Sequence, residues 1–128
     1  MIAPDAAPLG RHLLADLHGI AADLLTQPQA IEQILLRAAQ AAGATPIFSK
    51  FHQFGDGQGV TGVLLLRESH ISIHTWPEYR FAAVDVFMCG DAQPELAIGI
   101  LQQALRPLQS RVEEVARGAL LTELAIPA

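Results

Sequence analysis

Several features that mark whole classes of protein are missing from this sequence. A single cysteine, Cys89, cannot form an internal disulfide, and it is too few for a zinc site built from cysteines. Eight Lys and Arg residues stand against thirteen Asp and Glu residues, which gives a net charge of -5, and the basic residues are scattered singly along the chain. Nucleic-acid binding requires a basic patch or stripe, so we expect no nucleic-acid partner.

Long apolar runs are missing as well. No stretch reaches the roughly 18 to 20 uninterrupted apolar residues that a membrane helix needs. The opening residues, MIAPDAAPLGRHL, lack the basic, apolar and small-residue succession of a signal peptide. We therefore expect no membrane association and a cytoplasmic location.

The chain has ample apolar sequence for one folded domain. Its 128 residues are close to the usual size of a single domain, with 51% hydrophobic and only 16% charged residues. Such a composition can bury enough apolar surface to offset the entropy lost on folding. A chain this small and this apolar also favours an oligomer such as a dimer, because one globule cannot hide all of its apolar surface.

Two segments have the apolar spacing of amphipathic helices. In residues 28–42 and 94–105, apolar side chains recur close to i, i+3, i+4 and i+7. Each segment starts at a proline, which suits the first helical position because its missing N–H is not needed there. Gly43 follows the first segment and Pro107 follows the second, and both residue types commonly end helices. The sequence therefore predicts two helices.

The remaining segments have the character of short strands. They are rich in Val, Ile, Leu and Phe and are separated by turn sequences such as GDGQG, WPEY and CGD. The first could equally begin a helix. The resulting β-α-β-β-β-β-α-β order predicts an α+β fold, a two-layer sandwich in which a mainly antiparallel sheet is covered on one face by two helices. The predicted strands are residues 12–20, 45–54, 59–67, 69–76, 80–89 and 111–117.

Chemically active residues gather in residues 67–80, RESHISIHTWPEYR. Two isoleucines alternate with His70, Ser72 and His74, so a strand here has one apolar face and one polar face. The simplest interpretation is that these polar side chains are solvated or hydrogen-bonded within the fold.

Two chemical interpretations of the same residues stay open at this point. A metal site would use His70 and His74 with Cys89 or His12, although their spacing matches no standard zinc motif. A hydrolase would use Ser69 or Ser72 as nucleophile and His74 as base. It would also need an orienting group and an oxyanion hole that the sequence does not place.

The longer pattern GVTGVLLLRESHISIHTWPEYRFAAVDVFMCGD strongly resembles a known family. It is similar to the processing and catalytic core of the bacterial and archaeal type of S-adenosylmethionine decarboxylase, a small pyruvoyl-dependent enzyme. GRHLLADL, IEQILLRAAQAAGAT and KFHQF resemble the same family in order and spacing. The resemblance indicates a pyruvoyl-dependent decarboxylase domain at residues 10–118, with a flexible lead-in at 1–9 and a C-terminal tail at 119–128.

The resemblance implies that the chain is made as a precursor that cuts itself between Glu68 and Ser69. Ser69 would attack the preceding carbonyl, and elimination and hydrolysis would convert it to a pyruvoyl group, so that no external cofactor and no metal is needed. His74 matches the processing base of the family, and a near-neutral pKa suits that role. Thr61 stands where the family usually has a serine that assists the acyl shift.

For the mature enzyme, the resemblance implies a Schiff base between the pyruvoyl group from Ser69 and the amine of the substrate, which acts as an electron sink. Cys89 matches the general acid that returns a proton to the substrate. Glu78 matches the acid that binds the ribose, and Phe54 matches the aromatic residue near the adenine. A homodimer of processed protomers, with sites near the subunit boundary, is also implied.

The expected substrate is S-adenosylmethionine, whose decarboxylation supplies the aminopropyl donor for polyamine synthesis. Departures from the family pattern keep L-arginine or L-ornithine as an alternative, since residues 79–81, Met88, Gln53 and the GDGQG loop could each border the pocket. A second alternative is a ligand-binding homologue that does not cleave itself, because Thr61 replaces the usual serine.

Strand geometry adds one constraint on the scissile bond. Strict alternation would place Ser69 and His74 on opposite faces of the strand. The sequence therefore predicts a tight turn or bulge at residues 68 and 69, which would also strain the bond toward cleavage.

Overall fold

The computed structural model describes residues 7–119. It has the predicted order of elements, and each predicted boundary lies close to the observed one. Most of the predicted lead-in and tail lies outside the described residues. In chain order the elements are β1 (Gly10–His18), a 3-10 helix η1 (Ala22–Leu25), α1 (Pro28–Ala41), β2 (Pro46–Gln53), β3 (Val60–Leu66), β4 (Ser69–Trp76), a 3-10 helix η2 (Pro77–Tyr79), β5 (Phe81–Cys89), α2 (Pro94–Leu105) and β6 (Gln109–Arg117).

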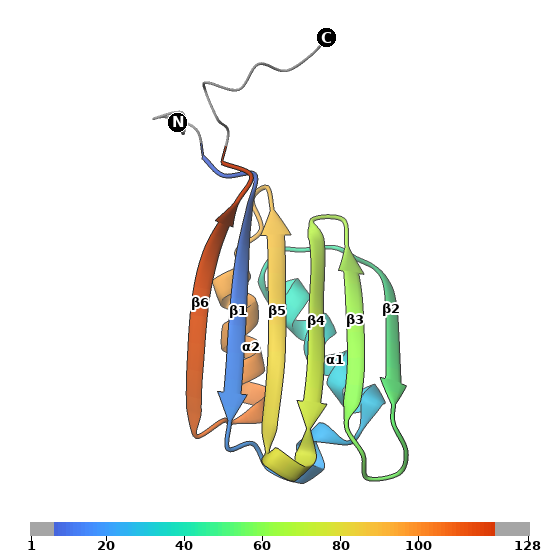
Figure 1. Cartoon of the computed structure of the whole chain (residues 1–128). Coiled ribbons are helices and arrows are strands. Elements are labelled where there is room, and N and C mark those ends of the chain that lie inside the picture. The colour runs from blue at the N-terminus through green and yellow to red at the C-terminus, as the bar shows by residue number, and fades with distance from the viewer. Residues whose placement is uncertain (1–6, 120–128) are drawn as a thin grey trace.

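The six described strands form one antiparallel sheet in the order β2-β3-β4-β5-β1-β6 (Figure 1). β2 to β5 follow one another as neighbours, as expected for strands joined by short turns. β1 then pairs with β5 on one side and with β6 on the other. Through these pairings the two ends of the domain lie side by side at one edge of the sheet.

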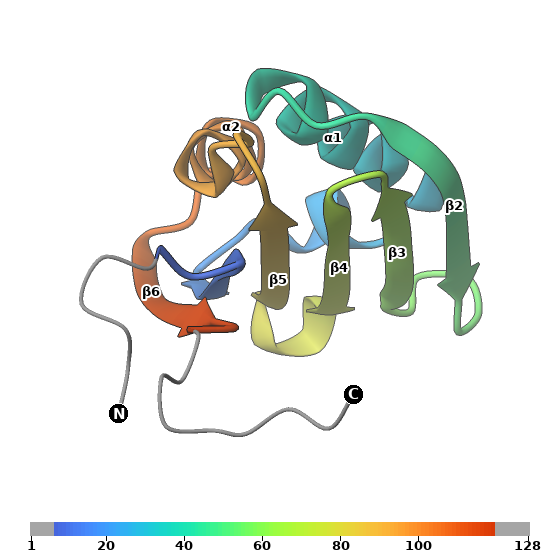
Figure 2. The same cartoon turned by 90° about the horizontal axis from the view of Figure 1, so that it is seen from above.

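Both helices cover the same face of the sheet, so the fold is the predicted two-layer sandwich (Figure 2). The core lies between the layers, where alternate strand residues and the apolar stripes of α1 and α2 are almost fully buried. None of the helices in the described part of the chain is long and apolar enough to span a membrane.

The first strand, which could equally have begun a helix, is a strand because it pairs with β5 on one side and with β6 on the other. Leu13, Ala15 and Leu17 are buried under the helices, while Leu14 and Asp16 between them are exposed. A helix would have brought these five residues to several faces, whereas a strand in the sheet buries every second one.

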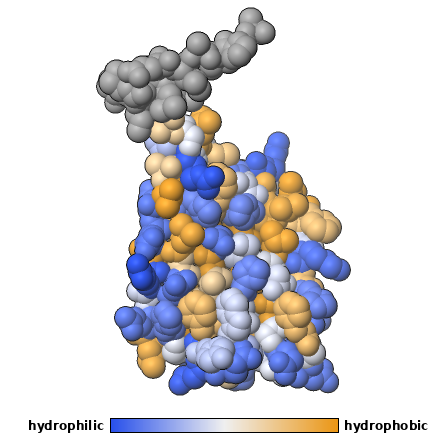
Figure 3. Space-filling view, viewed as in Figure 1, coloured by the Kyte–Doolittle hydropathy of each residue, from blue (hydrophilic) through white to orange (hydrophobic). Residues whose placement is uncertain are grey.

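The other face of the sheet carries no helix in the described structure, and we call it the open face. Figure 3 views the molecule from this side and shows apolar side chains interspersed with polar ones. Leu14, Leu65 and Val115 on this face are each about 40% exposed.

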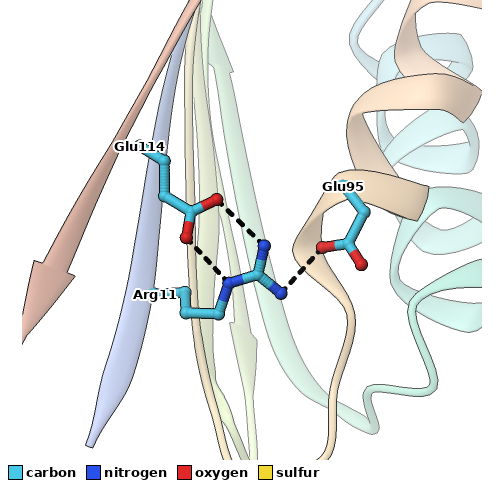
Figure 4. A network of polar contacts seen from close by, with 3 residues as sticks. All are labelled: Arg11, Glu95 and Glu114. Atoms are coloured by element: carbon cyan, nitrogen blue, oxygen red, sulfur yellow. Dashed lines mark hydrogen bonds and ion pairs between the residues drawn. The ribbon is translucent and has the colours of Figure 1, made fainter. Parts of the chain in front are cut away.

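A three-residue charge network ties the edge strand β6 to the rest of the fold (Figure 4). Arg11 on β1 donates two hydrogen bonds of 2.9 Å to the Glu114 carboxylate on β6 and forms a 2.9 Å ion pair with Glu95 on α2. The hydrogen bonds to Glu114 hold the pKa of Arg11 above its ordinary value, and the pKa of Glu114 is correspondingly lowered. The network therefore stabilises β6 only while Glu114 is ionised.

Candidate active site

The predicted scissile bond lies in a tight turn between β3 and β4. Leu66 pairs with Ser69, so Arg67 and Glu68 form a two-residue hairpin turn. The Arg67 N–H donates to the Thr45 carbonyl at 2.9 Å, and the Thr45 N–H donates to the Glu68 carboxylate at 2.8 Å. Both contacts hold the turn against the start of β2.

Ser69, directly after this turn, has a backbone conformation that L residues rarely adopt. Its φ is +146°. For a residue with a side chain this conformation costs about 1–3 kcal/mol and persists only where the surrounding structure imposes it. The distortion breaks the strand alternation, and Ser69 lines the same hollow as Phe87 and Cys89, which belong to the open face. The predicted turn with local strain at the bond is confirmed.

Cys89 contacts the carbonyl group of the predicted scissile bond with two donors. Ser69 pairs with Met88 across β4 and β5, which places Cys89 opposite Glu68. The Cys89 N–H donates to the Glu68 carbonyl oxygen at 3.0 Å, and its thiol donates to the same oxygen at 3.1 Å. Two donors on one carbonyl polarise it and would stabilise negative charge there. The sequence singled out Cys89 as a general acid, but its two hydrogen bonds to the Glu68 carbonyl are revealed only by the strand register.

A hollow of about 280 Å³ opens beside this turn. Its walls combine small residues, an aromatic ring and one cation, which leaves room for a ligand next to Ser69. The lining residues are Leu9, Gly10, Ser69, Phe87, Cys89, Arg117 and Gly118.

The other predicted site residues lie together at the opposite end of the sheet. Thr61 on β3 pairs with His74 on β4, and Thr61 Oγ1 lies 3.0 Å from His74 Nδ1. The hydroxyl thus orients the imidazole, and the other ring nitrogen, Nε2, is the one that can accept a proton from a reacting group. Both side chains are half-buried on the open face.

Glu78 and Phe54 complete this second group. They line a hollow of about 300 Å³ with Thr61 and His74. Phe54 is 63% exposed, so its ring is free to stack on a planar ligand. Glu78 lies in η2, directly after β4, where Pro77 starts the short helix.

A single chain keeps the two groups apart. Ser69 and His74 are five residues apart on β4, which at about 3.3 Å per residue is a separation of about 17 Å. A general base must approach its proton to about 3 Å. The tight turn changes the direction of Ser69, but it does not bring His74 of the same chain to it.

Between the two groups, the open face carries a polar cluster. The Ser72 hydroxyl donates to Asp85 Oδ2 at 3.2 Å, and His12 Nε2 lies 3.3 Å from Asp85 Oδ1. No hydrogen bond reaches His12 Nε2 from the described residues, so its contact with Asp85 is electrostatic. Burial, reinforced by His12, lowers the pKa of His70 below its ordinary value.

This cluster argues against the metal and hydrolase interpretations. His70 and His74 are four residues apart on one strand, about 13 Å, so one chain cannot place both on the same ion. Ser72 is hydrogen-bonded to Asp85 and not to His74.

Comparisons with known proteins show which family the chain belongs to. The sequence model of a family described as S-adenosylmethionine decarboxylase matches residues 11–118. A protein of Methanococcus maripaludis named S-adenosylmethionine decarboxylase proenzyme is 45% identical over 113 residues, 88% of this chain and 92% of the relative. A protein of the same name from Thermotoga maritima is 44% identical over 120 residues, 93% of this chain and 91% of the relative. The crystal structure of the adenosylmethionine decarboxylase from Aquifex aeolicus matches with a TM-score of 0.85 and 40% identity, over 94% of this chain and all of that chain.

The chain belongs to the S-adenosylmethionine decarboxylase family. The two-layer fold predicted from the sequence is thus the fold of a solved family member. The family is one of decarboxylases, so its description supports neither the metal nor the hydrolase interpretation.

The departures from the family pattern have structural explanations in this S-adenosylmethionine decarboxylase family member. Arg80, at φ +53°, occupies a left-handed position that favours glycine, and its Nε donates to the Ile20 carbonyl at 2.9 Å. Gln53 donates to the Thr26 carbonyl at 2.6 Å, and Met88 is 1% exposed in the core. Arg80, Gln53 and Met88 line neither hollow, although Gln53 also donates to the Gln58 carbonyl at 3.3 Å, and Gln58 of the GDGQG loop lines the hollow beside Glu78.

Proposed function

We propose that this chain is the proenzyme of a pyruvoyl-dependent S-adenosylmethionine decarboxylase that cuts itself between Glu68 and Ser69. One observation carries the proposal: a strained serine follows a carbonyl that already receives two hydrogen bonds from Cys89, beside a hollow large enough for a ligand. The hollow and the donors fit a pyruvoyl group at position 69. The decarboxylase domain extends over residues 10–118.

The chain's own residues account for the cleavage. Ser69 Oγ attacks the Glu68 carbonyl carbon, negative charge develops on the oxygen that Cys89 contacts, and collapse transfers the acyl group from nitrogen to oxygen. A base then removes the Ser69 Cα proton, and the Glu68 carboxylate leaves. Water adds to the resulting dehydroalanine and ammonia is released, which leaves a pyruvoyl group at the new chain start.

A second copy of the chain supplies the processing base in this proposal. Ser69 and His74 lie at opposite ends of β4, and both lie on the open side of the sheet. If two open faces pack with their strands reversed, the Ser69 end of each chain faces the His74 end of the other. Two complete sites result from one two-fold axis, and the exposed apolar residues of the open face are covered. The active form is therefore a homodimer.

After cleavage, the same residues serve decarboxylation. The pyruvoyl group supplies the electrophilic carbon and electron sink that take up the electrons released with CO₂. Cys89 returns a proton to the substrate carbon, Glu78 accepts hydrogen bonds from the ribose hydroxyls, and Phe54 stacks on the adenine. Because Glu78 and Phe54 share one hollow, the site fits a nucleoside better than arginine or ornithine, which have no sugar and no aromatic base.

The mass of the purified protein tests the proposal directly. We expect two fragments split between residues 68 and 69 in place of one 13.7 kDa chain, and an intact chain for Ser69→Ala. CO₂ release should then occur with S-adenosylmethionine and not with L-arginine or L-ornithine. An uncut wild-type chain would instead support the ligand-binding homologue.

A further inference from the structure

Arg117 lies in the hollow beside Ser69, and none of the assigned roles uses it. It ends β6, which the sheet order places two strands away from β5 and Cys89. Of the described residues that line this hollow, Arg117 is the only charged one. A cation next to the reactive end of the chain indicates an anionic ligand group.

Two contacts hold the guanidinium in place. It lies over the Phe87 ring, 5.4 Å from the ring centroid, and its Nη1 donates to His12 Nδ1 at 3.1 Å. His12 itself lies against Asp85, because its Nε2 is 3.3 Å from Asp85 Oδ1. The arginine is thus held by His12, which is itself placed beside Asp85.

Among the described residues, most of the hydrogen-bonding capacity of Arg117 is unused. A guanidinium has five N–H donors, and one is engaged by His12. Arg11 and Arg111 each form an ion pair with a glutamate, but no carboxylate of the described residues pairs with Arg117. Its fork of donors is therefore available to a carboxylate that enters the hollow.

We propose that Arg117 binds the α-carboxylate of the amino-acid substrate. The inference rests on the proposed function, in which the substrate amine reacts at position 69. The carboxyl carbon of an α-amino acid lies about 2.5 Å from its amine nitrogen, so the carboxylate must enter the same hollow. A guanidinium matches a carboxylate with two parallel hydrogen bonds. Arg117 thereby selects α-amino acids over simple amines, and the decarboxylated product, which lacks this group, is held less tightly.

Reductive trapping separates this role from a structural one. The processed protein is incubated with cyanoborohydride and either S-adenosylmethionine or its decarboxylated product, which has the same nucleoside and amine but no carboxylate. Mass spectrometry then measures the adduct on the chain that starts at position 69. For Arg117→Gln, we expect capture of S-adenosylmethionine to fall about 10- to 100-fold, which corresponds to the loss of a charge-assisted pair. Capture of the decarboxylated amine should stay at the wild-type level.

Two further variants sharpen the test. Arg117→Lys keeps the charge but loses the fork, so its capture of S-adenosylmethionine should lie between those of Arg117→Gln and the wild type. Arg111→Gln is the matched control, because Arg111 lies on the same strand, pairs with Glu113 and does not line the hollow. It should capture both ligands as the wild type does.

The possible failures are distinguishable. A wild-type chain that stays uncut overturns the proposed function, and this inference with it. A processed Arg117→Gln that keeps the wild-type preference for S-adenosylmethionine overturns the inference alone. If Arg117→Gln does not fold, the wild type and Arg117→Lys still decide: equal capture of both ligands by the wild type, or unchanged capture by Arg117→Lys, refutes carboxylate recognition.

Discussion

Self-cleavage should be restored when two inactive variants pair, because a mixed dimer contains one complete site. Ser69→Ala removes the group that becomes the cofactor, and His74→Ala removes the processing base. Neither chain should cut itself when produced alone. In a mixed dimer, the Ser69 of the His74→Ala chain faces the intact His74 of the Ser69→Ala chain, so the His74→Ala chain should be cut.

Strand geometry and two-fold symmetry give the expected fraction of His74→Ala chains that are cut. His74 lies about 17 Å along β4 from Ser69 of its own chain, far beyond the approach of about 3 Å that proton transfer needs. The His74 of a chain should therefore contribute negligibly to the cleavage of that same chain. With equal production and random pairing, about half of the His74→Ala chains are in mixed dimers, so about half of them should be cut.

The assay is co-production of the two variants with distinguishable affinity tags, followed by mass spectrometry of each chain. A chain that carries both substitutions is the matched control, because it offers no His74 and should rescue nothing. If the His74→Ala chain stays intact in purified mixed dimers, the reversed packing of two open faces is wrong. If it cuts itself equally well without a partner, His74 is not the processing base.

Three other substitutions give defined outcomes. Cys89→Ala removes the thiol donor from the Glu68 carbonyl but keeps the backbone donor, so cleavage should slow about 10-fold in a gel time course while CO₂ release is lost. Normal turnover would rule out Cys89 as the general acid. Arg11→Gln should lower the Tm more at pH 6 than at an acid pH at which Glu114 is protonated. The lowered pKa of Glu114 stabilises the fold fully above the ordinary carboxyl value of 4.5, and that stability is lost as the pH falls through the folded value. An equal loss at both pH values would contradict this. The lowered pKa of His70 means that its neutral form stabilises the fold fully above pH 6.5 and that this stability is lost as the pH falls. The Tm of His70→Asn should therefore decrease less than that of the wild type between about pH 7.5 and pH 5. An unchanged dependence of Tm on pH would show that protonation of His70 is not linked to folding.

The elements of this fold were readable from the sequence because they are encoded locally. Alternation of apolar residues in the strands and three- to four-residue spacing in the helices determine which side of each element is buried. The one ambiguous segment, at the first strand, became a strand because its apolar residues alternate at 13, 15 and 17 and pair between two other strands. Its tertiary neighbours, and not its own propensity, decided the outcome.

The departures from the family pattern were misjudged for a related reason. Arg80 and Gln53 stand next to predicted site residues in the sequence, which suggested that they border the pocket. In the structure, each donates to a backbone carbonyl of the segment between β1 and α1. Proximity along the chain says little about where a long polar side chain finds its hydrogen-bond partner.

By itself, the sequence determined the elements, the family and the bond that is expected to break, because RESHISIHTWPEYR is a continuous stretch. Only the tertiary structure decided how its residues are grouped. Strand pairing brings Cys89 to Glu68 and leaves Ser69 and His74 at opposite ends of β4. It also carries Arg117, from the far end of the domain, to the hollow beside Ser69. These relations depend on the register between strands distant in sequence, which no local pattern specifies.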